Sequence, residues 1–237
     1  MPTAKPDFSQ RADLIEKMDE PCSYGELRAC LHDIARVNRL TSAYRPVIEW
    51  LEKIVAASPS ESLRIVDVGC GYGDTLRTIE AWSEKSRIPV MLTGIDLNPD
   101  AIRAAREATH SNRIEWVVGD ALSNSIQDEI DIVISSLLTH HLTNPQIIQF
   151  LEWMEQRTRR GWFINDLHRQ PVPYGLFSFL ARFTNWHPFV KYDGPVSIRR
   201  SFRTEDWKDL TVAAGLAPET VAIREFRPAR LCVSRIK

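Results

Sequence analysis

The sequence has few cysteines, no long apolar run and no low-complexity tract. Its 237 residues include four cysteines, which form no C-x-x-C pair and show no metal-ligand spacing. Free thiols in a reducing cytoplasm are therefore the simpler interpretation. No segment approaches the roughly 18 consecutive apolar residues typical of a membrane span, and the first seven residues contain no apolar signal segment. We expect a soluble, cytoplasmic protein without a membrane span.

An excess of basic residues is also missing. The formal net charge is -1, from 30 Lys and Arg against 31 Asp and Glu. A protein that binds nucleic acid without sequence specificity usually carries a clear positive excess, so nucleic acid is not expected as a partner. The composition, with 43% hydrophobic and 26% charged residues, is ordinary. It fits one large domain, with or without a lid.

The most informative segment is a glycine-rich turn after a short apolar strand at 63–68. Gly69, Gly71 and Gly73 form the pattern G-x-G-x-G, and a helix-like segment follows at 74–84. Glycine reaches positive φ at little cost and lets a ligand lie against bare backbone. A strand, such a turn and a helix in this order predict a nucleotide-type cofactor site at the carboxyl edge of a parallel sheet.

The spacing separates this turn from two phosphate-binding motifs. The dinucleotide fingerprint G-x-G-x-x-G requires a third glycine where this chain has Asp74, and no Lys-Ser or Lys-Thr pair follows as in a P-loop. Asp67 lies two positions before the first glycine, where it would repel a pyrophosphate and suit a cationic ligand. This combination resembles the first motif of the class I S-adenosylmethionine-dependent methyltransferases.

Strands and helices alternate after a helical beginning. Apolar residues at three-and-four spacing predict helices at 11–18, 24–40 and 44–56, after which Ser58-Pro59-Ser60 breaks the pattern. Strands are expected at 63–68, 90–96, 114–118, 130–135 and 162–165, and helices at 74–84, 98–108 and 144–160, the last one stopped by Gly161. This order indicates a doubly wound parallel sheet. After a helix at 204–215, the runs 219–226 and 229–236 are too close for a crossover and predict a hairpin.

The family resemblance implies an α/β fold with a Rossmann-like, doubly wound, seven-stranded mixed sheet whose last strand is antiparallel. We interpret 1–237 as a single methyltransferase domain. Its parts are an N-terminal helical cap at 1–58, a cofactor-binding core at 59–166, an aromatic insertion or lid at 167–203, and a last helix with a terminal hairpin at 204–237.

Further motifs resemble the cofactor-binding positions of the family. Asp96 ends the second strand, where a carboxylate can accept both ribose hydroxyls. Leu97 is placed to cover one face of adenine. Gly119-Asp120-Ala121 resembles the adenine clamp, in which the carboxylate takes the exocyclic amine and the next backbone N–H meets a ring nitrogen. With Asp67, Gly69, Gly71 and Gly73, and with backbone contacts at Ser135 and Ser136, these positions imply S-adenosyl-L-methionine as the cofactor.

Methyl transfer from a sulfonium needs an aligned acceptor and removal of the acceptor's proton. A phenol, with a pKa of about 10, needs a base near neutrality. His140 and His141 follow the fourth strand, and Asp166 and His168 follow the fifth. These loops converge in an open parallel sheet. We expect His168 or one of the 140–141 pair to act as the base, with Asp166 orienting a histidine.

The insertion at 167–203 is dense in aromatic residues: Tyr174, Phe177, Phe179, Phe183, Trp186, Phe189, Tyr192 and Phe202. It is either a packed surface subdomain or a lid over the substrate. Its place beside the carboxyl edge of the sheet favours a flat, apolar substrate. Candidate substrate contacts are Arg169, Tyr174, Phe177 and His187.

Two absences narrow the acceptor. Ser135-Ser136-Leu137-Leu138 stands where amino-methylating enzymes have Asp/Asn-Pro-Pro-Tyr/Phe. A magnesium-dependent catechol enzyme would need carboxylates after both the fourth and fifth strands, and only Asn165-Asp166 supplies one. No metal is therefore expected.

The segments 163–169 and 193–202, together with His187-Pro188, resemble a bacterial small-molecule subgroup associated with polyketide, phenolic-lipid or quinone biosynthesis. This resemblance implies O-methylation of a phenolic or polyketide-like hydroxyl in secondary metabolism. C-methylation of an aromatic or quinol ring, a non-catalytic cofactor-binding regulator and a nicotinamide oxidoreductase remain alternatives. The oligomeric state stays open, and a homodimer is one option.

Overall fold

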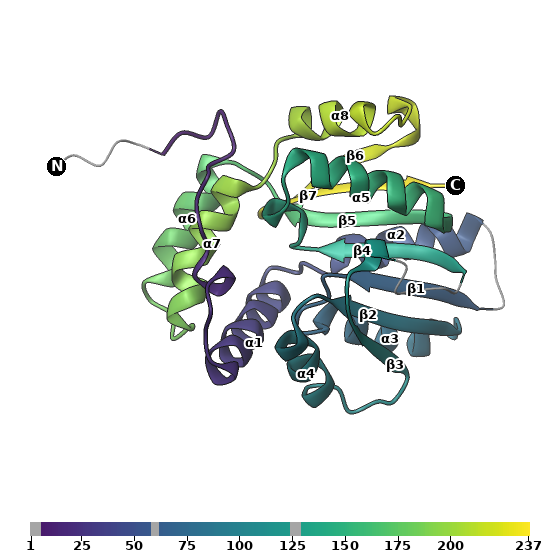
Figure 1. Ribbon diagram of the computed structural model, residues 1–237, viewed down its shortest axis with the longest axis horizontal. Helices are drawn as coiled ribbons and strands as arrows, with labels where there is room; N and C mark the ends of the chain where they lie inside the picture. The colour runs from purple at the N-terminus through teal and green to yellow at the C-terminus, as the bar shows by residue number, and fades with distance from the viewer. Residues whose placement is uncertain (1–5, 58–61, 124–128) are drawn as a thin grey trace.

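The computed structural model describes residues 6–57, 62–123 and 129–237 (Figure 1). The break predicted at Ser58-Pro59-Ser60 and the first five residues, where no apolar signal segment was expected, lie outside these ranges. The helices are α1 Tyr24–Leu40, α2 Arg45–Ala57, α3 Asp74–Ser86, α4 Pro99–Glu107, α5 Asn144–Arg157, α6 Pro171–Ala181, α7 Pro188–Arg200 and α8 Thr204–Ala213. Short 3-10 turns lie at Lys17–Asp19, Ala121–Ser123, Thr139–His141 and Pro218–Thr220. The strands are β1 Leu63–Val68, β2 Val90–Asp96, β3 Ile114–Val118, β4 Ile130–Ser136, β5 Thr158–Leu167, β6 Ala222–Phe226 and β7 Arg230–Ile236.

The strands form one seven-stranded sheet in the order β3-β2-β1-β4-β5-β7-β6. The pairs among the first five strands are parallel, whereas β7 runs antiparallel to both β5 and β6. The predicted α/β fold, with its doubly wound mixed sheet and antiparallel last strand, is confirmed. The chain reverses its strand order beside β1, which is where an open sheet of this kind forms a ligand crevice.

The sheet is covered by helices on both faces (Figure 1). One face packs against α2, α3 and α4 through an apolar cluster that includes Trp50, Ile79 and Ile102. The other packs against α5 and α8 through a cluster that includes Phe150 and Trp207. The helices α1, α6 and α7 lie beyond one end of the strands (Figure 1). They are therefore free to cover the crevice.

Local signals set several element bounds as expected. The helix predicted at 24–40 begins and ends at those residues, and its Ser23 and Glu26 form a capping box. Asn98 caps α4 through a hydrogen bond from the Asp100 backbone N–H, with Pro99 in the first turn. The strands predicted at 90–96 and 114–118 also have the expected bounds.

The helix predicted at 11–18 is wrong. Helical hydrogen bonding occurs there only in the 3-10 turn Lys17–Asp19. The backbone N–H of Ala12 instead donates to the carbonyl of Arg199 in α7, and the side chain of Glu16 is buried. This segment, residues 11–19, is called the N-terminal strap below. Contacts with α7 and with the loop after β4 set its path, and these contacts override its local pattern.

Gly161 does not stop a helix. The helix α5 ends at Arg157, and Gly161 lies inside β5 with a φ of 144°. A Cβ added there would lie 2.1 Å from the carbonyl oxygen of Arg235 in the neighbouring strand β7. Glycine is required because two backbones approach closely.

The insertion after β5 consists of the two helices α6 and α7 and is closed at its base. His168 and Phe202 form an isolated parallel bridge, and the backbone N–H of Arg169 donates to the carbonyl of Phe202. In the part of the chain that the structure describes, no helix is both long and apolar enough to cross a membrane.

Candidate active site

A cavity of about 910 Å³ lies at the carboxyl ends of β1, β2 and β4. Its wall comes from the glycine turn, the ends of β2 and β3, the loop after β4, the helices α1, α6 and α7, and the N-terminal strap. Ligand sites commonly occupy about 300–1,000 Å³, so this cavity is at the large end of that range.

The glycine turn forms one end of the cavity. Gly69 and Gly71 have positive φ values of 70° and 51° and line the cavity. The backbone N–H of Gly71 donates to Asp96 Oδ2 at 2.9 Å, and this bond joins the turn to the end of β2. Gly73 was expected to contact the cofactor but is not among the lining residues. A Cβ on Gly73 would lie 2.2 Å from the ring of Trp116, so its glycine serves packing.

Carboxylates gather around this turn. Asp96 accepts a second hydrogen bond from the Asn98 backbone N–H at 2.9 Å, and burial raises its pKa. Asp67 is 2% exposed, and its Oδ1 has no hydrogen-bond partner among the described residues. Burial is the main cause that raises the pKa of Asp67, and the negative charges of Asp74 and Asp96 raise it further. Such a group gains from a cationic or hydrogen-donating ligand, as expected for the cofactor end.

The remaining cofactor positions line the same cavity. Leu97 is 72% exposed, so one side of it is free to cover a flat ring. Asp120 begins the 3-10 turn after β3 and accepts a hydrogen bond from the Leu122 backbone N–H. Ala121 and Ser136 are also lining residues.

A histidine cluster forms the other part of the cavity wall. The ring Nδ1 of His140 lies 2.7 Å from Asp166 Oδ1, and its backbone N–H donates to Asp166 Oδ2 at 3.0 Å. Thr139 also donates to Asp166. Burial alone would raise the pKa of Asp166, but His140 and these hydrogen bonds hold it below its usual range. Asp166 therefore orients a histidine as the sequence predicts, and that histidine is His140.

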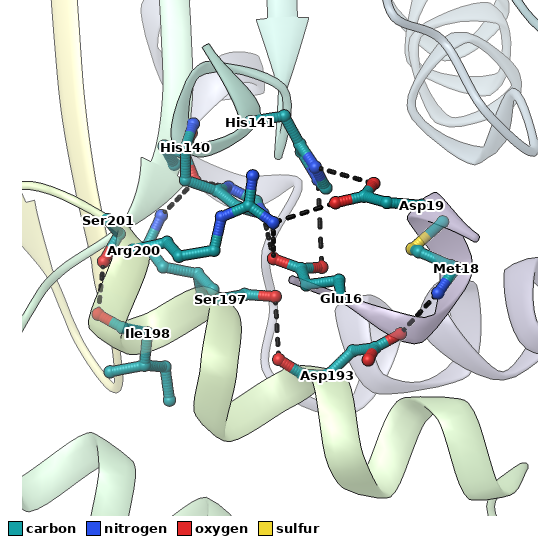
Figure 2. Close-up of polar contacts among 12 residues, drawn as sticks. Glu16, Met18, Asp19, His140, His141, Asp193, Ser197, Ile198, Arg200 and Ser201 are labelled. Atoms are coloured by element: carbon teal, nitrogen blue, oxygen red, sulfur yellow. Dashed lines mark hydrogen bonds and ion pairs between the residues drawn. The ribbon is translucent and has the colours of Figure 1, made fainter. Parts of the chain in front are cut away.

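His141 faces the strap. Its Nδ1 lies 3.1 Å from Asp19 Oδ1, and its Nε2 lies 3.9 Å from Glu16 Oε2 (Figure 2). It is 24% exposed and lines the cavity, whereas His140 is 3% exposed. Burial would raise the pKa of Asp19, but hydrogen bonds from His141 and Arg200 lower it. His141 is the more accessible imidazole, with an ionised carboxylate behind it.

Glu16 lies between both imidazoles (Figure 2). Its Oε1 is 3.5 Å from His140 Nε2 and 3.4 Å from an Arg200 nitrogen. Burial raises the pKa of Glu16 to about 7, against the opposing effects of His141 and Arg200. Nothing in the local pattern of the strap marked Glu16 or Asp19 as functional, because both reach the site only through the folded path of residues 11–19.

The ligand atoms of Glu16, His140 and His141 lie within 4.8 Å of one another, a spacing that can also hold a metal ion. Arg200 already places a cation there, 3.4 Å from Glu16 and 2.8 Å from Asp19. The expectation that no metal takes part stays a prediction.

The strap is fixed from both sides. The backbone N–H groups of Lys17 and Met18 donate to the carboxylate of Asp193 in α7, at 2.7 and 3.1 Å. The guanidinium of Arg11 donates to the carbonyls of His140 and Leu142 in the loop after β4. Glu16 and Asp19 are thereby held against the histidines.

Two further predicted site residues, His168 and Arg169, lie away from the cavity wall. His168 is 5% exposed and is absent from the cavity wall; its Nδ1 is 3.7 Å from Glu225 Oε2 in β6. Burial lowers the pKa of His168. Arg169 is 1% exposed, and its guanidinium binds Asp206 and the carbonyls of Phe8, Ser9 and Ser201. It joins residues 8 and 9, the insertion and α8, and each of its three guanidinium nitrogens already donates within the protein.

Of the aromatic residues predicted to contact the substrate, only some line the cavity. Tyr174 packs edge-on against Phe8, and His187 caps α7 by accepting a hydrogen bond from the Phe189 backbone N–H; neither lines the cavity. Phe177 does line it and stacks on Trp186 at 5.6 Å between ring centroids.

Comparison with known proteins shows which proteins this chain resembles in sequence and in fold. Residues 65–161 match the family model of the methyltransferase domain. Ribosomal protein L11 methyltransferase of Burkholderia mallei is 35% identical over 99 residues, 41% of this chain and 29% of that protein. The chain thus spans under a third of the curated relatives it matches.

Two solved structures illustrate the fold. The plantazolicin methyltransferase BamL, in complex with a triazolic desmethylPZN analog and SAH, has a TM-score of 0.65 at 18% identity, over 87% of this chain and 89% of that one. Human N-acetylserotonin methyltransferase in complex with SAM has a TM-score of 0.64 at 15% identity, over 91% and 56%. S-adenosylmethionine is the cofactor of this family. Residues 65–161 thus match a methyltransferase domain, and the chain has the fold of the class I S-adenosylmethionine-dependent methyltransferases.

Proposed function

We propose that this protein transfers a methyl group from S-adenosylmethionine to the hydroxyl of a small phenolic or polyketide-like molecule. The observation that carries the proposal is that one cavity joins the glycine and carboxylate end to the histidine cluster. Its volume leaves space for an acceptor beside the cofactor.

The cofactor end fits the chemistry of S-adenosylmethionine. Asp96 would accept from the ribose hydroxyls, and Asp120 would accept from the adenine amine under the cover of Leu97. The unpartnered Oδ1 of Asp67 offers a further acceptor in a buried, negatively charged region. S-adenosylmethionine supplies the activated methyl group, so the chain's task is to align the acceptor and remove its proton.

His141 is the proposed base. A hydrogen bond from Nδ1 to Asp19 leaves Nε2 with a free lone pair, as in a histidine–carboxylate dyad. As the acceptor oxygen bonds to the methyl carbon, the sulfur–methyl bond breaks and the hydroxyl proton passes to Nε2. The products are S-adenosylhomocysteine and a methyl ether.

The acceptor end is mainly apolar. The cavity is lined by Leu176, Phe177 and Leu180 of α6 and by Trp186 after it. Apolar walls with a few polar groups favour an aromatic or long apolar acceptor. They offer little to a charged substrate such as nucleic acid.

The experiment incubates the protein with S-adenosylmethionine and a panel of phenols and aromatic polyketides. Formation of S-adenosylhomocysteine together with a product one methylene heavier is expected. The proton NMR shift of the new methyl group distinguishes a methyl ether from C-methylation. Cofactor binding without product across the panel would contradict the proposal and favour a regulatory protein.

A further inference from the structure

The helix α6 presents an outer face of large apolar side chains without a partner in the described residues. Val172, Leu176 and Phe179 of α6 and Phe183, in the turn just after it, follow one another at spacings of four, three and four, which is the spacing of one side of a helix. They are 76%, 49%, 57% and 75% exposed. With Leu180, which is 46% exposed, they form what is called the α6 stripe below.

The opposite side of α6 is firmly docked. Phe177 packs so closely on α7 that a Cβ on Gly194 would lie 2.1 Å from its ring. Phe177 also stacks on Trp186, and Ala181 is buried. The helix therefore cannot turn its outer face inward without losing these contacts, and the α6 stripe is a fixed feature of the surface.

The charge around the α6 stripe has one sign. From Leu167 to Tyr192 the sequence contains no Asp or Glu, in a chain where acidic residues are as common as basic ones. Arg182, inside the stripe's span, is exposed, and Lys191 is half-buried at the start of α7. An apolar helix face whose charged neighbours in the sequence are all cations complements a surface that is apolar below and anionic at its edge.

The stripe also continues into the cavity. Leu176 and Leu180 are exposed on the outside and at the same time belong to the lining residues. A molecule lying along the stripe would thus pass these two side chains on entering the cavity.

The size of the stripe argues against a second copy as the occupant. A helix of this length is about 17 Å long and about 10 Å wide, which gives roughly 170 Å² of outer face. A standard protein interface covers about 800 Å² on each partner. A bilayer imposes no such requirement, because a short apolar face with basic neighbours is enough for reversible interfacial binding.

We propose that the α6 stripe docks on the surface of an anionic lipid bilayer, with the cavity mouth facing the headgroups. Docking itself stands apart from the reaction. The consequence that an amphiphilic acceptor enters from the bilayer rests on the proposed function.

Vesicle co-sedimentation tests the docking on the full chain. Vesicles of phosphatidylcholine alone are compared with vesicles in which phosphatidylglycerol replaces part of the phosphatidylcholine. The variant F179E/F183E places two charges on the stripe, at residues that do not line the cavity. The matched control V212E places a charge on the equally exposed Val212 of α8, which is 55% exposed.

The wild type and V212E are expected to sediment with the anionic vesicles, less at high salt, while F179E/F183E loses at least about tenfold in partitioning. S-adenosylmethionine affinity should be equal in all three proteins, which shows that the variants are folded. Failure of the wild type to sediment, or equal loss in V212E, would overturn docking on lipid. A wild-type dimer that F179E/F183E converts to a monomer would show that a second copy covers the stripe instead. Loss of methyl transfer with intact sedimentation would affect only the proposed function.

Discussion

The imidazole of His141 lines the cavity with Asp19 behind it, whereas His168 is enclosed near β6. Their sequence environments are alike, since each follows the end of a parallel strand. What separates them is the strap, which brings a carboxylate to His141. The His140–Asp166 pair is more deeply buried, and it holds the loop that carries His141.

Replacing His141 by Gln is expected to lower kcat by about 10²- to 10⁴-fold, the usual contribution of a general base. The affinity for S-adenosylmethionine should not change. His168→Gln serves as the matched control and should keep near-wild-type turnover. Single-turnover assays with saturating cofactor measure both; a large loss in the His168 variant together with full activity in the His141 variant would contradict the assignment.

Glu16 is expected to make the free energy of unfolding depend on pH. Its pKa of about 7 in the fold is above the ordinary value of 4.5, so the folded protein binds more protons than the unfolded chain between these two values. The contribution of protonated Glu16 to stability is therefore lost as pH rises from about 4.5 to about 7. Its facing groups His140, His141, Arg200 and Asp19 are present in the variant as well, so the difference isolates Glu16.

Glu16→Gln should therefore gain stability relative to the wild type as pH rises through this window, by roughly 3 kcal/mol at most. Urea unfolding at a series of pH values between 5 and 8 measures the gain. A difference that is flat with pH, or that favours the wild type at high pH, would show that Glu16 is ionised and paired throughout.

At the scale of elements, alanine substitutions of two glycines, one in a strand and one in a helix, are expected to change the free energy of unfolding differently. Gly161→Ala would place a Cβ 2.1 Å from the backbone of β7 at a φ of 144°, and neither strand can move away. We expect a loss of about 2 kcal/mol or more in the free energy of unfolding. Gly175→Ala, in the open middle of α6, should be neutral or should stabilise by about 0.5–1 kcal/mol.

Denaturant unfolding of both variants at one pH checks the pair. The two substitutions add the same methyl group, so equal effects would mean that the close approach of β5 and β7 does not exist in solution.

The sequence allowed prediction of those elements whose signals are local. The capping box at Ser23 and the Asn98-Pro99 start fix α1 and α4 regardless of distant contacts. The positions of the glycine turn and of Asp96 are likewise predictable, since the strand–turn–helix order places them at the carboxyl edge of the sheet, where both line the cavity. Gly161 misled the prediction because a glycine next to a helix end and a glycine in a crowded strand look identical in sequence.

The histidine cluster could be predicted only in part. The meeting of His140 with Asp166 follows from neighbouring parallel strands. The approach of Glu16 and Asp19 does not, because their contacts with Asp193 and Arg200 join segments far apart in the chain. Residues 11–19 contain apolar positions at helical spacing, but the side chains of Arg11 and Glu16 contact His140, which is far away in the sequence.

For the whole molecule, the proposed function divides between two parts. One is the carboxyl edge of the sheet, and the other is the cover formed by the strap and the insertion. In the proposed function, the glycine turn, Asp96 and Asp120 at the carboxyl edge of the sheet would bind the nucleoside part of the cofactor without help from this cover. The strap and the insertion complete the acceptor end, where His141, Glu16 and Phe177 line the wall. We therefore expect cofactor affinity and turnover to respond separately to substitutions in these two parts.

Calorimetric titration of S-adenosylmethionine into the wild type, Asp96→Ala and Asp100→Ala tests the central claim most directly. Asp96 lines the cavity, whereas Asp100 belongs to the next helix and does not. The expected result is one site in the wild type and in Asp100→Ala, and an affinity lower by about 10- to 100-fold in Asp96→Ala, because hydrogen bonds to a charged group are lost. No heat with S-adenosylmethionine or S-adenosylhomocysteine, binding of NADH in their place, or equal affinity in all three proteins would contradict the account.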